Sequence, residues 1–130
     1  MTNSESLIQA GLKYSGVHIC ESEQNPLLMD LAQKHAQYMA DNQKLGHQNF
    51  QSRFDLIREQ LGYNASEIAA MSWDRESNFA LDEVSKGMFD SWKSSRGHWK
   101  IASIKHKVFG AGMEKNETNG IYYACMIVAD

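Results

Sequence analysis

The segment "GIYYACMIVA", residues 120–129, decides the fold because it is apolar at both its odd and its even positions. Successive side chains of an extended strand point to opposite faces of the sheet. The two sets of apolar side chains are Ile121, Tyr123, Cys125 and Ile127 on one face, and Tyr122, Ala124, Met126 and Val128 on the other. A strand that is apolar on both faces is covered on both faces. The segment therefore predicts a central strand buried between two layers.

Two further segments have strand character. The run "HKVFGAGMEK" at 106–115 precedes the central strand, and the polar stretch between them ends in Asn119-Gly120, a strong hairpin signal. The run "ASEIAAMSW" at 65–73 is short and apolar, which predicts a short strand or a buried connector. These runs indicate an antiparallel sheet.

The remaining segments repeat their apolar residues at helical spacing. We expect helices over 4–14, 26–43, 49–62 and 78–92. Asn25-Pro26 is a typical helix start, and Gly62 a typical helix end. Helices around a strand that is covered on both faces imply an α+β fold, a three-layer α/β/α sandwich with a central antiparallel sheet. One proline and no repeats or linkers leave a single domain over 1–130.

Composition excludes several classes of partner. Thirteen basic and sixteen acidic residues give a net charge of -3, so no nucleic acid or anionic lipid is expected to bind through overall charge. No apolar run is long enough for a membrane span. The first residues, "MTNSESLIQA", lack the features of a signal peptide, so we expect synthesis in the cytoplasm. For Cys20 and Cys125 a single bridge stays open, although two buried thiols are favoured.

Two of the five histidines are candidates for chemistry. His47 and His98 each follow a glycine at an expected helix–loop junction, where an imidazole is easily exposed. Two imidazoles and a carboxylate suit zinc or a similar divalent ion, and they also suit acid–base work. The two histidines are too far apart in sequence to form a metal-binding motif. Ser94 or Ser95 beside His98 lacks the elbow motif of a serine nucleophile and is more typical of a helix cap.

The other three histidines have a different interpretation. His35 lies on the apolar stripe of its helix, which favours a hydrogen-bonded core residue. His18 and His106 lie in loop and strand-edge contexts, and we assign no role to them.

Several motifs together resemble a known family. They are "LGHQNFQSR" (45–53), "SEIAA" (66–70), "SWKSSRGHWKIA" (91–102), and "FGAGMEK" (109–115) followed by "GIYYACMIVA". In their order and spacing they resemble the CAP superfamily of cysteine-rich secretory, antigen 5 and pathogenesis-related 1 proteins, in its short bacterial SCP-like form. The resemblance runs from about residue 25 to residue 130 and implies the same three-layer sandwich.

The resemblance also implies a site. Its motif positions place His47, Glu67 and His98 in one cleft that binds zinc or another divalent cation in several members. The residues expected to support this cleft are Arg53, Trp92 and Ser95. Two departures affect the motifs: Arg96 replaces a proline before Gly-His, and Ile68 replaces the asparagine after the acid.

Three functions follow as expectations. The first is a non-enzymatic binding module for a protein or lipid-like ligand, whose His/Glu cleft is able to hold a divalent ion. The second is a metal-assisted, peptidase-like hydrolase that uses the same cleft. The third is a structural or interaction subunit of a larger assembly such as a phage particle, released by lysis or carried in that particle.

Overall fold

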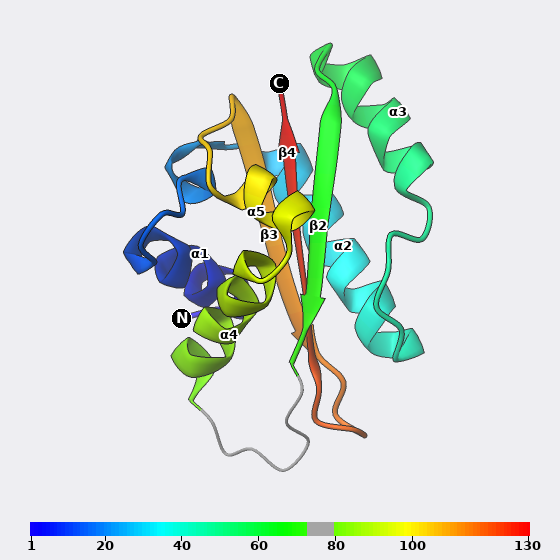
Figure 1. Ribbon diagram of the computed structural model, residues 1–130. Helices are drawn as coiled ribbons and strands as arrows, with labels where there is room; N and C mark the ends of the chain where they lie inside the picture. Colours follow the sequence, from blue (N-terminus) through cyan, green and yellow to red (C-terminus); the bar gives the residue numbers. More distant parts are fainter. Residues whose placement is uncertain (73–79) are drawn as a thin grey trace.

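The helices and strands of the chain form three layers in a computed structural model that describes residues 1–72 and 80–130 (Figure 1). In chain order they are α1 (Asn3–Lys13), the 3-10 turn η1 (Ile19–Glu21), β1 (Glu23–Gln24), α2 (Pro26–Asn42), α3 (Phe50–Leu61), β2 (Ala65–Met71), α4 (Leu81–Lys93), α5 (Arg96–Ala102), β3 (Val108–Lys115) and β4 (Tyr122–Ala129).

The four strands form one sheet in the order β1-β3-β4-β2. β4 is antiparallel to both of its neighbours, β3 and β2, as the sequence predicts. The two-residue β1 adds a parallel pair beside β3, so the sheet is mixed at that edge. β2, for which the sequence predicts a strand or a connector, is the strand at the opposite edge.

Both faces of β4 are buried, and they belong to two separate apolar cores. Ala124, Met126 and Val128 pack in the core that includes side chains of α1 and α4. Tyr123, Cys125 and Ile127 pack in the core on the side of α2 and α3. Figure 1 shows α1, α4 and α5 on one side of the sheet and α2 and α3 on the other. The predicted α/β/α sandwich is confirmed.

The two cysteines lie in different cores. Cys20 belongs to the core that contains α1, and Cys125 belongs to the core on the other side of the sheet. Both are free and buried, so the bridge left open by the sequence is not formed. Burial raises the pKa of Cys20 to about 12 and raises that of Cys125 well above its ordinary value.

Two glycines of β3 let the backbone of α2 approach the sheet closely. A Cβ atom on Gly110 would lie 2.1 Å from the carbonyl carbon of Leu28, and one on Gly112 would lie 2.5 Å from the Cα of Gln33. α2 therefore rests on β3 through backbone atoms, and a loop follows its end at Asn42. That loop carries His47.

The structure corrects one local prediction. Residues 96–102, where the sequence predicts a helix–loop junction at His98, form the short helix α5. Its Trp99 packs against Tyr14 at 6.3 Å between ring centres. Asn78, the expected start of the preceding helix, lies outside the described residues. In the part of the chain that the structure describes, α4 begins at Leu81. None of the helices in the described ranges is long and apolar enough to cross a membrane.

Candidate functional site

A buried carboxylate, Glu67 of β2, is the centre of the candidate site. Its side chain is 1% exposed, and Arg53 of α3 binds both of its oxygens. Arg53 Nε donates to Oε1 at 2.7 Å, and Nη2 donates to Oε2 at 2.8 Å. Arg53 Nη1 also donates to the carbonyl of Gln48 at 2.8 Å. Such a bidentate, charge-assisted pair fixes the orientation of the carboxylate. The sequence-based expectation for Arg53 was a supporting role in the cleft.

His47 forms the second contact of Glu67. Its Nδ1 lies 2.7 Å from Glu67 Oε2. A carboxylate only accepts hydrogen bonds, so Nδ1 donates and Nε2 of the neutral ring carries the free lone pair. The side chain of His47 is 46% exposed. A carboxylate that holds one nitrogen of a half-exposed imidazole is the arrangement that orients many metal-binding histidines.

His35 stabilises the loop that carries His47. It is 3% exposed, and its Nε2 donates to the Gly46 carbonyl at 2.7 Å. Its Nε2 is also 3.9 Å from Glu67 Oε2. Burial lowers the pKa of His35. This neutral, hydrogen-bonded histidine agrees with the structural role predicted from the apolar stripe.

The surroundings of Glu67 favour its charged form. Burial alone would raise the pKa of the carboxyl group, but the hydrogen bonds from His47 and Arg53, together with the charges of Arg53 and His35, lower the pKa below its ordinary value. Glu67 is therefore an ionised group that is neutralised locally by Arg53.

His98 lies in the first turn of α5 rather than in the loop predicted for it. One turn later on the same helix face, Ile101 lines the hollow that also contains His47 and Glu67. Burial lowers the pKa of His98, and the charge of the nearby His47 lowers it further. His98 makes no hydrogen bond to another side chain within 1–72 and 80–130. The structure thus brings His47, Glu67 and Arg53 into contact, whereas His98 is not among the residues that line the hollow.

The hollow has a volume of about 410 Å³. It is lined by His47, Phe50, Ala65, Ser66, Glu67 and Ile101. In the sequence, Phe50 and Ile101 each lie within a motif, at 45–53 and 91–102, but neither is among the predicted site residues. An apolar residue at helical spacing looks the same in sequence whether it faces the core or a hollow, so no sequence signal distinguished them.

The other expected supporting residues, Trp92 and Ser95, are not among the residues that line the hollow. Trp92 is fully buried, and its Nε1 donates to the Ala69 carbonyl of β2 at 3.0 Å. Ser95 occupies the N-cap position of α5, and its carbonyl accepts from the Trp99 amide at 2.9 Å. Ser94 Oγ donates to the Ser91 carbonyl at 2.7 Å, as a helix cap does.

The three residues expected to hold a cation, His47, Glu67 and His98, do not form a three-ligand site in the described part of the chain. Within the two described ranges, no group of three or more His, Cys, Asp and Glu side chains is arranged to hold a metal ion. Both oxygens of Glu67 are already bonded to Arg53 and His47. Glu67 therefore fits the role of an orienting acid, and the available donors are His47 Nε2 and the imidazole of His98.

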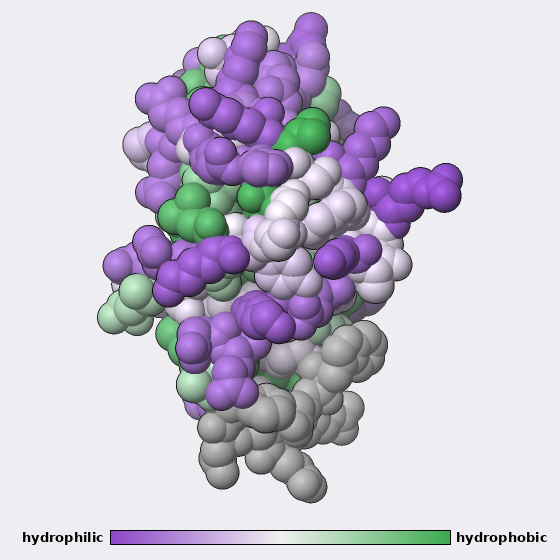
Figure 2. All heavy atoms as spheres, turned by 60° about the vertical axis from the view of Figure 1, so that its left-hand side comes forward, coloured by the Kyte–Doolittle hydropathy of each residue, from purple (hydrophilic) through white to green (hydrophobic). Residues whose placement is uncertain are grey.

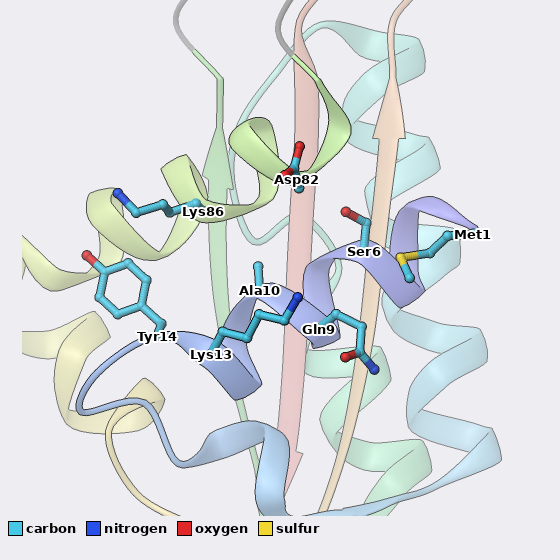
Figure 3. A pocket seen from close by; sticks show the side chains of 8 residues that line it. All are labelled: Met1, Ser6, Gln9, Ala10, Lys13, Tyr14, Asp82 and Lys86. Carbon is cyan, nitrogen blue, oxygen red and sulfur yellow. The ribbon is translucent and has the colours of Figure 1, made fainter.

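A second hollow, of about 390 Å³, lies between α1 and α4. Figure 3 shows its side chains, among them Lys13 at the end of α1, Tyr14 directly after it, and Lys86 of α4. The hydroxyl of Tyr14 donates to Asp90, and this bond raises the pKa of Tyr14 to about 12. The face seen in Figure 2 is mostly hydrophilic, with small separate hydrophobic patches. None of the predicted site residues lines this second hollow.

Comparisons with known proteins agree with this geometry at the level of the fold. The sequence model of the cysteine-rich secretory protein family matches residues 23–127. Among solved structures, an outer surface protein from Borrelia burgdorferi is similar, with a TM-score of 0.65 and 18% sequence identity over 100% of this chain and 96% of that one. No curated protein matches the chain in sequence. An identity of 18% shows a shared fold and carries no statement about activity.

Proposed function

The chain belongs to the cysteine-rich secretory protein family, and we propose that it is a binding module whose cleft holds a divalent cation between His47 and His98. The observation that carries this proposal is the 2.7 Å contact between His47 Nδ1 and Glu67. It leaves Nε2, the nitrogen suited to a metal, on a side chain that is nearly half exposed.

The donor set suits zinc or a related ion. Neutral imidazole nitrogen is a common zinc ligand, and burial favours the neutral form of His98. Two protein ligands leave further coordination positions for water or for donor atoms of a ligand. A cation held in this way would help to capture a ligand in the hollow, which is consistent with a binding role.

Binding is favoured over hydrolysis by the state of Glu67. A general base needs a free lone pair within reach of the water it activates. Glu67 is buried and held by Arg53 and His47 through both oxygens, so a peptidase-like reaction would have to use His47 Nε2 or His98 as its base. The third expectation, a subunit of a larger assembly such as a phage particle, stays a prediction; isolation of the protein with its native partners would test it.

Calorimetric titration with zinc tests the proposal. We expect His47→Ala and His98→Ala each to abolish measurable binding. Glu67→Gln should weaken binding by about 10- to 100-fold, the usual effect of losing an orienting carboxylate. His18→Ala is the matched control, because His18 is an exposed histidine that contacts Glu21 outside the hollow. Unchanged affinity in both His47→Ala and His98→Ala would refute the site.

A further inference from the structure

β2 is an edge strand, and half of its backbone groups face away from the sheet. Asn64 and Asp130 exchange two backbone hydrogen bonds, at 2.9 and 3.1 Å, at the start of the β2–β4 ladder. Hydrogen-bonded and non-hydrogen-bonded pairs alternate along an antiparallel ladder. With the register Ala65↔Ala129, the even residues of β2 therefore bond to β4. The N–H and C=O groups of Ala65, Glu67, Ala69 and Met71 are directed to the free edge.

Part of this edge has no partner among residues 1–72 and 80–130. The carbonyl of Ala69 accepts from Trp92 Nε1. Within the residues that the structure describes, the N–H and C=O groups of Ala65 and Glu67 have no hydrogen-bond partner. Yet Ala65 is only 8% exposed and Glu67 only 9%. An edge strand with free N–H and C=O groups is a template for pairing with another chain.

The same two residues line the 410 Å³ hollow. Phe50, from α3 on one side of the sheet, and Ile101, from α5 on the other side, also line it. The unpaired edge at residues 65–67 thus lies between two apolar side chains. Free backbone groups flanked by apolar contacts are the features by which edge strands recognise extended peptides.

We propose that the hollow binds an extended peptide segment, which adds a strand to β2 by pairing with the backbone of Ala65 and Glu67. Alternate side chains of this segment contact Phe50 on one face and Ile101 on the other. A single peptide chain fits better than a second copy of this protein, because the second β2 would bring its own α3 and α5 against the same flanks. An extended peptide is thus the ligand class for the hollow of the proposed function. Pairing of the peptide with the edge does not require the cation.

The probe is a capped hexapeptide of alternating threonine and valine, titrated in EDTA into the ¹⁵N-labelled full chain. We expect saturable shifts of the Ala65 and Glu67 amide signals, and at least tenfold slower hydrogen exchange of these two amides. Amides of the even residues, such as Ser66 and Ile68, already bond to β4 and should change less. The same peptide with every amide N-methylated cannot donate to the edge and should not bind.

A proline substitution tests the edge from the protein side. Ala65→Pro removes one edge N–H without removing a bond to β4, and we expect at least tenfold weaker peptide binding. Met71→Pro makes the same change at the same edge but outside the hollow, so this variant should bind the peptide with unchanged affinity. If Ala65→Pro does not fold, the N-methylated peptide still provides the decisive comparison.

Two results would overturn the proposal. One is the absence of shifts at Ala65 and Glu67 while the peptide is in excess. The other is protection of these amides in a self-associated form of the protein, which would make a second copy the occupant. Because the titration is done in EDTA, its failure leaves the zinc site untouched, and a failed zinc titration leaves the peptide result untouched.

Discussion

At the scale of single residues, the site depends on the buried pair of Arg53 and Glu67. Their side chains are 10% and 1% exposed, and removal of one partner leaves an uncompensated buried charge. We expect Arg53→Ala to lower the free energy of unfolding by about 3–5 kcal/mol in urea titrations. Arg58→Ala, on the same helix but at the surface, should cost less than about 1 kcal/mol. Equal losses in the two variants would contradict the assigned role of Arg53.

Glu67 also makes stability depend on pH. Its pKa in the folded protein is below 4.5, the ordinary value that applies to the unfolded chain. As the pH falls below 4.5, the unfolded state binds a proton before the folded state does. The stabilisation is therefore complete above 4.5 and is lost as the pH falls through the folded pKa.

Urea unfolding of the wild type and Glu67→Gln in EDTA measures this effect. We expect the difference in unfolding free energy between them to shrink as the pH falls below 4.5. A difference that stays constant from neutral pH into that acid range would show that Glu67 is not held in its charged form.

At the scale of elements, the contact of α2 with β3 leaves no room for a side chain at Gly110. A side chain at Gly110 would overlap the backbone of α2, so Gly110→Ala must displace the helix or the strand. We expect a loss of at least about 1–3 kcal/mol, the usual cost of overpacking. Gly87→Ala is the matched control, because no atom lies within 4 Å of the added Cβ and Gly87 is in the middle of α4. It should gain about 0.5–1 kcal/mol.

Thermal or urea unfolding of both glycine variants checks the prediction. A neutral effect of Gly110→Ala would mean that α2 does not pack on β3 through its backbone.

The elements were predictable where the pattern was strong over many residues. The two apolar faces of 120–129 predicted both outer layers, since a strand needs cover wherever it is apolar. α5 was missed because Ser94, Ser95 and Gly97 together are typical of a turn, and a seven-residue helix is too short to show periodicity. β1, with two residues, forms only because β3 pairs with it, and a local pattern contains no such information.

At the scale of the whole molecule, the meeting of His47, Glu67 and Arg53 depends on how three separate elements pack. The motif resemblance placed His47, Glu67 and His98 in one cleft and gave Arg53 a supporting role, but spacing alone did not. No sequence pattern showed that Arg53 and His47 occupy both oxygens of Glu67. The unpaired edge of β2 could not be predicted from the sequence either, because it depends on the strand order β1-β3-β4-β2.

The most direct test of the central claim is to observe the imidazole nitrogens of the intact protein by ¹H–¹⁵N NMR during a zinc titration. We predict that His47 Nε2 and the ring of His98 change together at the same zinc concentration, while His47 Nδ1 keeps its proton and its bond to Glu67. The signals of His35 should stay in place, since its Nε2 is bonded to the Gly46 carbonyl. Unchanged signals of His47 and His98, or a change at His47 Nδ1 instead of Nε2, would contradict the account.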